Sequence, residues 1–190
     1  YTFKKYLGWY VEDGARLSAF GQIRKVGVGW LVSALYLFTI LICLFVTRHY
    51  SVAHLNFNLG HQLSWLSIFL LVAVIEEIIT RGIVFRFITD KWNVVAGLVV
   101  SSITFGFVHL FNPNTTALYC LRIAITGGWL CGIAYAYHRT LWVSIGIHWA
   151  WNYIQSNIFE HSVPGSALNS PPILTLASKG VKFPDRKSVV

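Results

Sequence analysis

Five long runs of apolar residues alternate with short polar segments along the chain. They cover residues 26–47, 63–89, 92–110, 117–137 and 141–159. The first run contains no charged residue, and a helix of that length, rising about 1.5 Å per residue, crosses the roughly 30 Å of hydrocarbon in a bilayer. The pattern predicts an all-α protein, a polytopic transmembrane helical bundle with about five membrane spans.

The polar segments divide the chain into three parts. Residues 1–25 mix polar, aromatic and basic side chains and are interpreted as an N-terminal segment outside the membrane. Residues 26–160 form the predicted transmembrane core, in which 48–62 is a polar loop with three histidines. Residues 161–190 contain four of the five prolines and are expected to form a loop-like tail.

Composition supports a membrane protein. Of the 190 residues, 12% are charged and 55% are hydrophobic, whereas about 25% of a soluble domain is charged. This balance excludes intrinsic disorder and leaves too little polar surface for an ordinary soluble globule. The three cysteines lie in apolar runs without CxxC spacing, so neither a disulfide framework nor a zinc knuckle is predicted.

The net charge of +8 indicates membrane topology rather than nucleic-acid binding, because the basic residues form no run and no helical face. Five of them precede the first apolar run, and others lie at the second-to-third and fourth-to-fifth junctions. The positive-inside rule then places the N-terminus in the cytoplasm. The basic tail would lie outside, a conflict that a further span would remove. This conflict and the absence of methionine lead us to expect a fragment of a longer chain.

Glu76, Glu77 and Arg81 interrupt the second apolar run, where each charge costs roughly 2.5–3.5 kcal/mol at mid-bilayer. Glu77 precedes Arg81 by four residues, which is the favourable spacing and order for a helical ion pair. Glu76 points about 100° away from Glu77 around the helix and lacks that partner, so it is suited to act as a general base. The alternative interpretation is a structural ion network at a helix interface.

Two further pairs of side chains share a helical face: Phe105 with His109, and His148 with Asn152. A single membrane histidine is more often a packing residue. However, Glu76, the two histidines and Asn152 lie on three different helices and can converge on one cavity. There a carboxylate can activate water, a histidine can hold the water or a metal, and an amide can donate to an oxyanion.

Other intramembrane protease chemistries lack their residues. The sequence contains no HExxH motif for a zinc protease helix and no GxSG-type serine turn. Its aspartates, Asp13, Asp90 and Asp185, all lie outside the deep parts of the apolar runs, which excludes an aspartyl dyad.

Three motifs in order resemble those of the CPBP family of intramembrane proteases. They are EExxxR at 76–81, FxxxH at 105–109 and HxxxN at 148–152. This family is also called the type II CAAX prenyl endopeptidase, bacteriocin-processing and abortive-infection-like family. The resemblance covers about residues 63–155, so the core at 26–160 resembles a protease core.

The resemblance implies an integral membrane endopeptidase that hydrolyses a peptide bond of a membrane-anchored protein or peptide, with the lipid bilayer as its other partner. The substrate would be a prenylated CAAX C-terminus or a peptide precursor. Glu76 would activate the attacking water with His109, and His148 with Asn152 would stabilise the oxyanion. By the same resemblance, the orienting or structural side chains are Glu77, Arg81 and Phe105.

More than one cofactor and more than one function are compatible with these residues. Glu76, His109 and His148 are ligand types of zinc or another divalent metal, and a glutamate mechanism without tightly bound metal uses the same side chains. A transporter or proton relay also places Glu, His and Arg within the membrane. A bis-histidine haem protein would use His109 and His148 but leaves the Glu-Glu-Arg cluster unexplained. A non-catalytic membrane scaffold is compatible too, because fold does not fix function.

Overall fold

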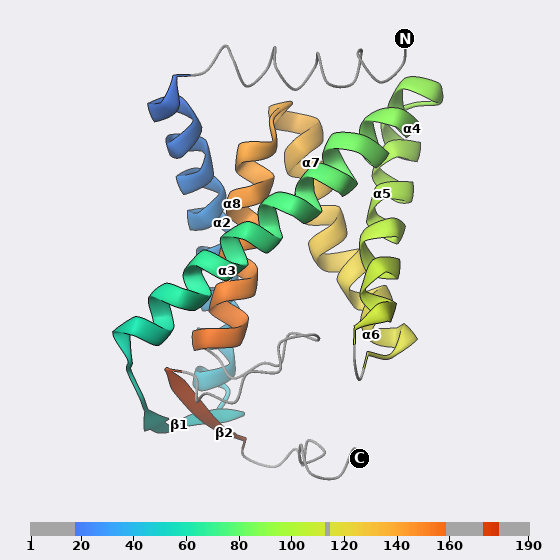
Figure 1. The fold of residues 1–190 in the computed structure, drawn as a ribbon. Coiled ribbons are helices and arrows are strands. Elements are labelled where there is room, and N and C mark those ends of the chain that lie inside the picture. Colours follow the sequence, from blue (N-terminus) through green and yellow to red (C-terminus); the bar gives the residue numbers. More distant parts are fainter. Residues whose placement is uncertain (1–17, 113–114, 159–172, 179–190) are drawn as a thin grey trace.

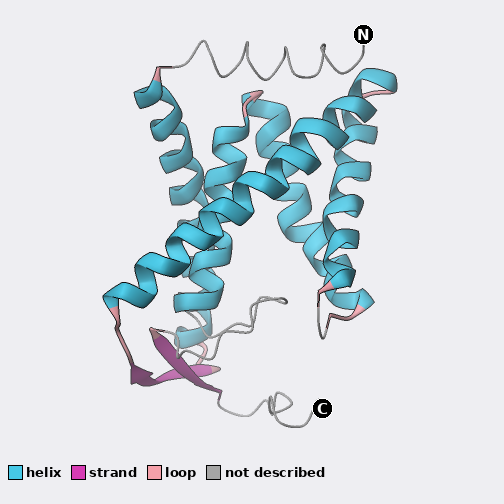
Figure 2. Ribbon diagram, viewed as in Figure 1, coloured by secondary structure: helices cyan, strands magenta, loops and turns pink. Residues whose placement is uncertain are grey.

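The computed structural model describes residues 18–112, 115–158 and 173–178, which form a helical bundle with a small sheet at one end (Figures 1 and 2). In chain order the elements are α2 (Ala19–Val46), β1 (Tyr50–Leu55), α3 (Leu59–Glu77), the π-helix η1 (Ile78–Phe85), α4 (Arg86–Lys91), α5 (Val94–Val108), the 3₁₀ turn η2 (His109–Phe111), α6 (Ala117–Ile123), the π-helix η3 (Ala124–Gly128), α7 (Trp129–His138), α8 (Leu141–Tyr153), the π-helix η4 (Ile154–Ile158) and β2 (Leu174–Ser178). The predicted helical bundle is confirmed.

Three helical stretches of the described residues are long and apolar enough to cross a membrane. They are Ala19–Val46, Val94–Phe111 and Ala117–His138. The stretch from α3 to α4, which carries Glu76, Glu77 and Arg81, and the stretch of α8 and η4 pack with these helices in one bundle. The protein is therefore a multi-pass membrane protein with about three to five spans, where the sequence alone predicts about five.

Polar residues immediately before the helices fix where several helices begin. Ser18 accepts a hydrogen bond from the backbone N–H of Gly21, and Asn58 accepts one from that of His61. Asn93 caps α5 and Thr116 caps α6 in the same way. Each cap satisfies an N–H group that lacks a partner within the helix. Two of these caps, Asn58 and Asn93, mark the starts of the two stretches that bring Glu76 and His109 into the bundle.

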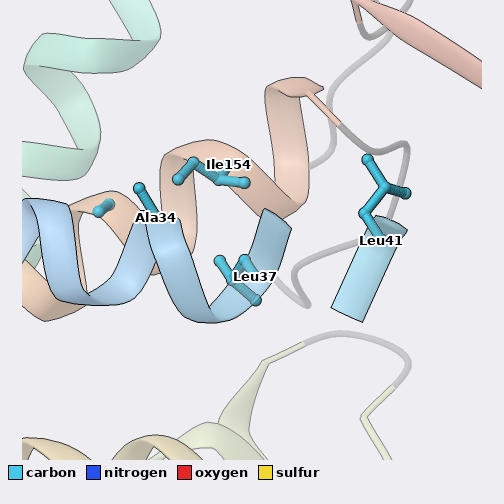
Figure 3. Close-up of a cluster of buried hydrophobic side chains, with 5 residues drawn as sticks. Ala34, Leu37, Leu41 and Ile154 are labelled. Atoms are coloured by element: carbon cyan, nitrogen blue, oxygen red, sulfur yellow. The ribbon is translucent and has the colours of Figure 1, made fainter. Parts of the chain in front are cut away.

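Helices α2 and α8 pack closely because each contributes a glycine at the crossing. A Cβ on Gly29 would collide with the carbonyl oxygen of Val143, and a Cβ on Gly146 would collide with that of Val26. Such close backbone approach is typical of membrane helix pairs. Further along the same pair, the side chains of Ala34, Leu37, Leu41 and Ile154 form a buried cluster with Ala150 (Figure 3). This packing holds α8, the helix that carries His148, in the centre of the bundle.

Two segments that the sequence predicts as loops pair with each other as strands. β1, from the polar loop at 48–62, runs antiparallel to β2, from the tail, with Tyr50 opposite Ser178 and Leu55 opposite Leu174. The backbone N–H of Ile173 also donates to the carbonyl of Asn157 at 2.7 Å, which ties this sheet to the end of η4. The pairing was not predictable from local pattern because it joins segments more than 100 residues apart. The rest of the tail and residues 1–17 lie outside the described residues. Residues 19–25 of the predicted N-terminal segment are helical, because helix α2 begins at Ala19, seven residues before the predicted start of the first span.

Helix α3 runs obliquely across the bundle, whereas α2, α5 and α8 are steeper (Figure 1). The oblique path brings the middle of one helix level with the end of another. Glu76 lies near the middle of the continuous helical stretch of α3, η1 and α4, and His109 lies where α5 gives way to η2. Their meeting in space therefore does not require them to lie at the same depth within their own helices.

Candidate active site

A buried ion pair lies at the centre of the contacts that hold the site together. Arg81 Nη1 donates to Glu77 Oε1 at 2.7 Å, and both side chains are fully buried. The i, i+4 pair predicted from the sequence is therefore present. His148 on α8 places its Nδ1 3.0 Å from the same Glu77 oxygen, so one carboxylate links α3, η1 and α8. Long-range contacts of this kind have no signature in the local sequence.

Backbone and hydroxyl oxygens satisfy more of the Arg81 donors. Nη1 also donates to Thr80 Oγ1 at 2.8 Å, and Nη2 donates to the carbonyl of Gly128 at 2.8 Å. A carbonyl oxygen has two lone pairs and can accept such a bond in addition to its helical one. Gly128 ends the π-helix η3, and Arg81 itself lies in the π-helix η1. Short π-helical segments within α-helices are frequent at functional sites.

The ring of Phe105 contacts Arg81 and both histidines. The guanidinium carbon of Arg81 is 4.5 Å from the centre of its ring, a cation–π contact. The rings of His109 and His148 meet it edge-on, with ring centres 5.1 and 5.3 Å away. Because Phe105 is buried at 4% exposure, these contacts restrict the orientation of both imidazoles.

Glu76 faces both histidines across a gap. Its Oε2 lies 3.7 Å from His148 Nε2 and 4.0 Å from His109 Nε2, beyond direct hydrogen-bonding distance. This oxygen is buried and has no hydrogen-bond partner among the described residues. The Glu76 side chain as a whole keeps 28% exposure. It is therefore the more accessible of the two adjacent carboxylates.

The hydrogen-bond network assigns the protons of the two imidazoles. His109 Nδ1 lies 2.7 Å from the carbonyl oxygen of Phe105, and His148 Nδ1 faces the Glu77 carboxylate, so each Nδ1 must donate. In the neutral imidazole the Nε2 atom is then an acceptor. Three acceptor atoms, Glu76 Oε2 and two Nε2 atoms, thus face one another without a donor between them.

A cavity adjoins this cluster. Its volume is about 40 Å³, which exceeds the roughly 10–15 Å³ that one water needs. The lining residues are Phe105, His109, Tyr119, Ile123, Thr126, Gly127, Cys131, Ile147, His148, Trp151, Asn152 and Gln155. Asn152 thus lines the same cavity as both histidines, whereas Glu76 does not line it but faces the two histidines that do. The structure brings all seven sequence-predicted site residues together.

Several residues at the site were not predicted from the sequence. Thr80 and the carbonyl of Gly128 hold Arg81, and Cys131 and Tyr119 line the cavity. The Gly127–Gly128 pair is visible in the sequence, but nothing in its spacing indicates that a carbonyl there accepts an arginine. Such residues can be identified only from the tertiary structure, in which α5, η3 and α8 pack together.

The chemistry of Glu76, His109 and His148 suits zinc, but their spacing does not. With bonds of about 2.0–2.2 Å, two ligand atoms on a tetrahedral zinc are about 3.4 Å apart, whereas Glu76 Oε2 stands 3.7 and 4.0 Å from the histidine nitrogens. Within the described ranges, no group of three His, Cys, Asp or Glu side chains has the arrangement of a metal site. The spacing of these atoms is therefore wider than a tetrahedral zinc requires.

The fold and the site together define a helical membrane protein with a carboxylate–histidine centre of the kind that hydrolases use. A family model described as type II CAAX prenyl endopeptidase Rce1-like matches residues 58–154, slightly more than half of the chain. The chain belongs to this family, which confirms the resemblance to CPBP intramembrane proteases. No curated protein and no solved structure matches the chain.

Family membership supports an intramembrane endopeptidase acting on a peptide or protein in a bilayer. It favours this class over the transporter and the haem protein that the sequence alone leaves open. A scaffold built on the same fold would share the family match and is distinguished by its lack of activity. The matched range contains all seven predicted site residues, from Glu76 to Asn152.

Proposed function

We propose that the protein hydrolyses a peptide bond of a membrane-anchored substrate with a water molecule activated by Glu76. The observation that carries this proposal is the meeting of Glu76 Oε2 with the Nε2 atoms of His109 and His148. Acceptors 3.7 to 4.0 Å apart with no donor between them are the setting in which a bridging water is expected. A water there donates one hydrogen to the carboxylate and the other to a histidine nitrogen.

In the proposed reaction the bridging water loses a proton to Glu76 as its oxygen attacks the carbonyl carbon of the scissile bond. His109 accepts the second hydrogen bond of that water and orients it, with its own Nδ1–H held by the Phe105 carbonyl. The proton on Glu76 then passes to the leaving amine. This is general acid–base catalysis by one carboxylate, which contributes typically 10²–10⁴-fold.

His148 and Asn152 are proposed to stabilise the oxyanion. The Asn152 amide supplies N–H donors to the cavity. His148 donates from Nε2 once it has taken up a second proton from solvent before the attack, and it keeps that proton throughout, while Glu76 Oε2 and His109 Nε2 hold the water. In that state Nδ1–H stays on Glu77 Oε1, 3.0 Å away. The negative charge of Glu77, which also pairs with Arg81, then faces the Nδ1–H of the imidazolium and holds its orientation while Nε2 faces the substrate.

The proposed substrates are a prenylated CAAX C-terminus or a membrane-associated peptide precursor. The family supports a peptide or protein substrate in general. The setting of the site in a bundle with exposed apolar helices supports a substrate that is itself held at the bilayer.

The test compares Glu76→Gln with the wild-type protein on two probes in proteoliposomes, a farnesylated CAAX peptide and an unprenylated precursor-type peptide with a membrane anchor. Loss of the base is expected to lower kcat/KM by at least about 100-fold while the thermal unfolding midpoint is unchanged. Ser67→Ala is the control, because its hydroxyl is exposed on the same helix and bonds only to the Leu63 carbonyl. Cleavage at the wild-type rate by Glu76→Gln would exclude the proposal, and the two probes separate the two substrate classes.

A further inference from the structure

A second cavity is lined by residues of η1, α4, α5 and α7 and by Arg139 in the turn between α7 and α8. Figure 1 shows that α4 and this turn lie at the same end of the bundle. Its volume is about 50 Å³, and it shares no lining residue with the cavity at the candidate active site. Its lining residues are Phe85, Arg86, Thr89, Asp90, Val94, Tyr135, Ala136 and Arg139. None of these residues has a part in the proposed hydrolysis.

The floor of this cavity is a buried arginine on an aromatic ring. Arg86 is 4% exposed, donates from Nε to the hydroxyl of Tyr135, and has its guanidinium carbon 5.4 Å from the centre of that ring. Asp90 and Arg139 are exposed at the mouth. The cavity therefore carries two guanidinium groups and one carboxylate, an excess of one positive charge, and guanidinium groups are the preferred partners of phosphate oxygens.

Aromatic side chains place this end of the bundle at the membrane surface. Trp92 is 60% exposed and Tyr137 is 82% exposed, and Lys91 lies 5.4 Å from the Trp92 ring. Exposed Trp and Tyr next to basic residues are typical of the level of lipid headgroups. The positive-inside pattern assigns Arg86, Lys91 and Arg139 to the cytoplasmic side, where anionic lipids are concentrated.

From this charge, burial and location, we propose that the cavity between α4 and α7 binds the phosphate of an anionic phospholipid headgroup. Arg86 at the floor and Arg139 at the mouth contact phosphate oxygens, and Asp90 reduces the affinity by like-charge repulsion. The acyl chains lie along the exposed apolar surface of the neighbouring helices. This site is independent of the proposed peptidase activity, so either proposal can fail without the other.

The experiment measures binding of phosphatidylglycerol and phosphatidylcholine to the full chain in detergent by native mass spectrometry. We expect phosphatidylglycerol to bind more tightly than phosphatidylcholine, and Arg139→Gln to lower its affinity about fivefold, as for loss of one basic residue near a membrane surface. Arg48→Gln is the matched control. Arg48 is also exposed, has a φ of 58° against 54° for Arg139, and follows the C-terminal end of a helix remote from this cavity.

Asp90→Asn separates a lipid site from a purely structural ion network. A phosphate site predicts that removal of this negative charge raises phosphatidylglycerol affinity several-fold, whereas an ion network predicts no gain. If an equal concentration of inorganic phosphate displaces the lipid, the cavity is an anion site whose ligand is a soluble phosphate, and the lipid proposal is wrong. Equal binding of the two lipids, or unchanged phosphatidylglycerol affinity in Arg139→Gln, would overturn the proposal.

Discussion

His148 directs its Nδ1 toward Glu77 Oε1, 3.0 Å away, and the same oxygen is 2.7 Å from Arg81 Nη1. Glu77 is fully buried, whereas Glu76 keeps 28% exposure and has an Oε2 without a hydrogen-bond partner among the described residues. Two adjacent carboxylates thus have different surroundings. Glu77 is fixed by a cation and an imidazole, and Glu76 faces the histidines across a gap.

The same substitution is therefore expected to have different effects at the two glutamates. Glu77→Gln leaves Arg81 buried without its counter-charge, and breaking a buried pair in this way costs about 3–5 kcal/mol. Glu76→Gln breaks no ion pair with an arginine and is expected to change the free energy of unfolding by less than about 1 kcal/mol. Thermal denaturation of both purified variants in one detergent measures the difference. Equal midpoints would show that the Glu77–Arg81 pair does not stabilise the bundle.

Phe105 is expected to be a positioning residue. Phe105→Leu keeps an apolar side chain in the core but removes the ring that both imidazoles contact, so His109 and His148 gain rotational freedom. We expect kcat to fall about tenfold to 100-fold, as for a misplacement of about 1 Å, with KM nearly unchanged. Phe107→Leu, on an exposed face of the same helix, is the control. A change in KM alone would assign Phe105 to substrate binding instead.

Much of the site can be predicted from the sequence because its residues follow helical spacing. The Glu77–Arg81 pair rests on an i, i+4 interval, and so does the placement of His148 and Asn152 on one cavity. The cost of charge in a membrane explains why Glu76 and Glu77 stand out within their apolar run. Which glutamate is buried cannot be predicted in this way, because the answer depends on α8, more than 70 residues further along the chain.

The parts that were not predicted depend on backbone geometry and long-range pairing. The turns η1 and η3 are π-helical, and no residue type in them distinguishes a π-helix from an α-helix. The acceptor that Gly128 offers to Arg81 is a backbone carbonyl, which every residue has. The sheet of β1 and β2 joins a predicted loop to a predicted tail, and its register is fixed by tertiary contacts.

Metal removal tests the remaining prediction about a cofactor. Zinc held by Glu76, His109 and His148 stays a prediction from residue types, whereas the spacing of these atoms favours a metal-free resting site. We expect purified protein to contain well under one zinc per chain and to keep its activity after dialysis against a strong chelator. One zinc per chain that is lost in His109→Ala, together with activity restored only by added zinc, would contradict the metal-free mechanism.

Substitutions of the two neighbouring glycines of η3 are expected to separate an effect on substrate binding from an effect on stability. A Cβ on Gly127 would meet the Phe105 ring at 3.5 Å, an ordinary contact, and the added methyl would occupy part of the cavity that Gly127 lines. A Cβ on Gly128 would lie 3.1–3.2 Å from three atoms of Ser102, which are too close to be accommodated without moving α5.

We therefore expect Gly127→Ala to lower kcat/KM, mainly through KM, while its unfolding free energy rises by up to about 0.5–1 kcal/mol from the helix preference of alanine. Gly128→Ala is expected to lower the unfolding midpoint, because its methyl separates η3 from α5 and also shifts the carbonyl that accepts Arg81 Nη2. Peptide cleavage kinetics and thermal denaturation on the two variants side by side check both. If Gly127→Ala cleaves the peptide with unchanged KM, the cavity that it lines does not receive the substrate.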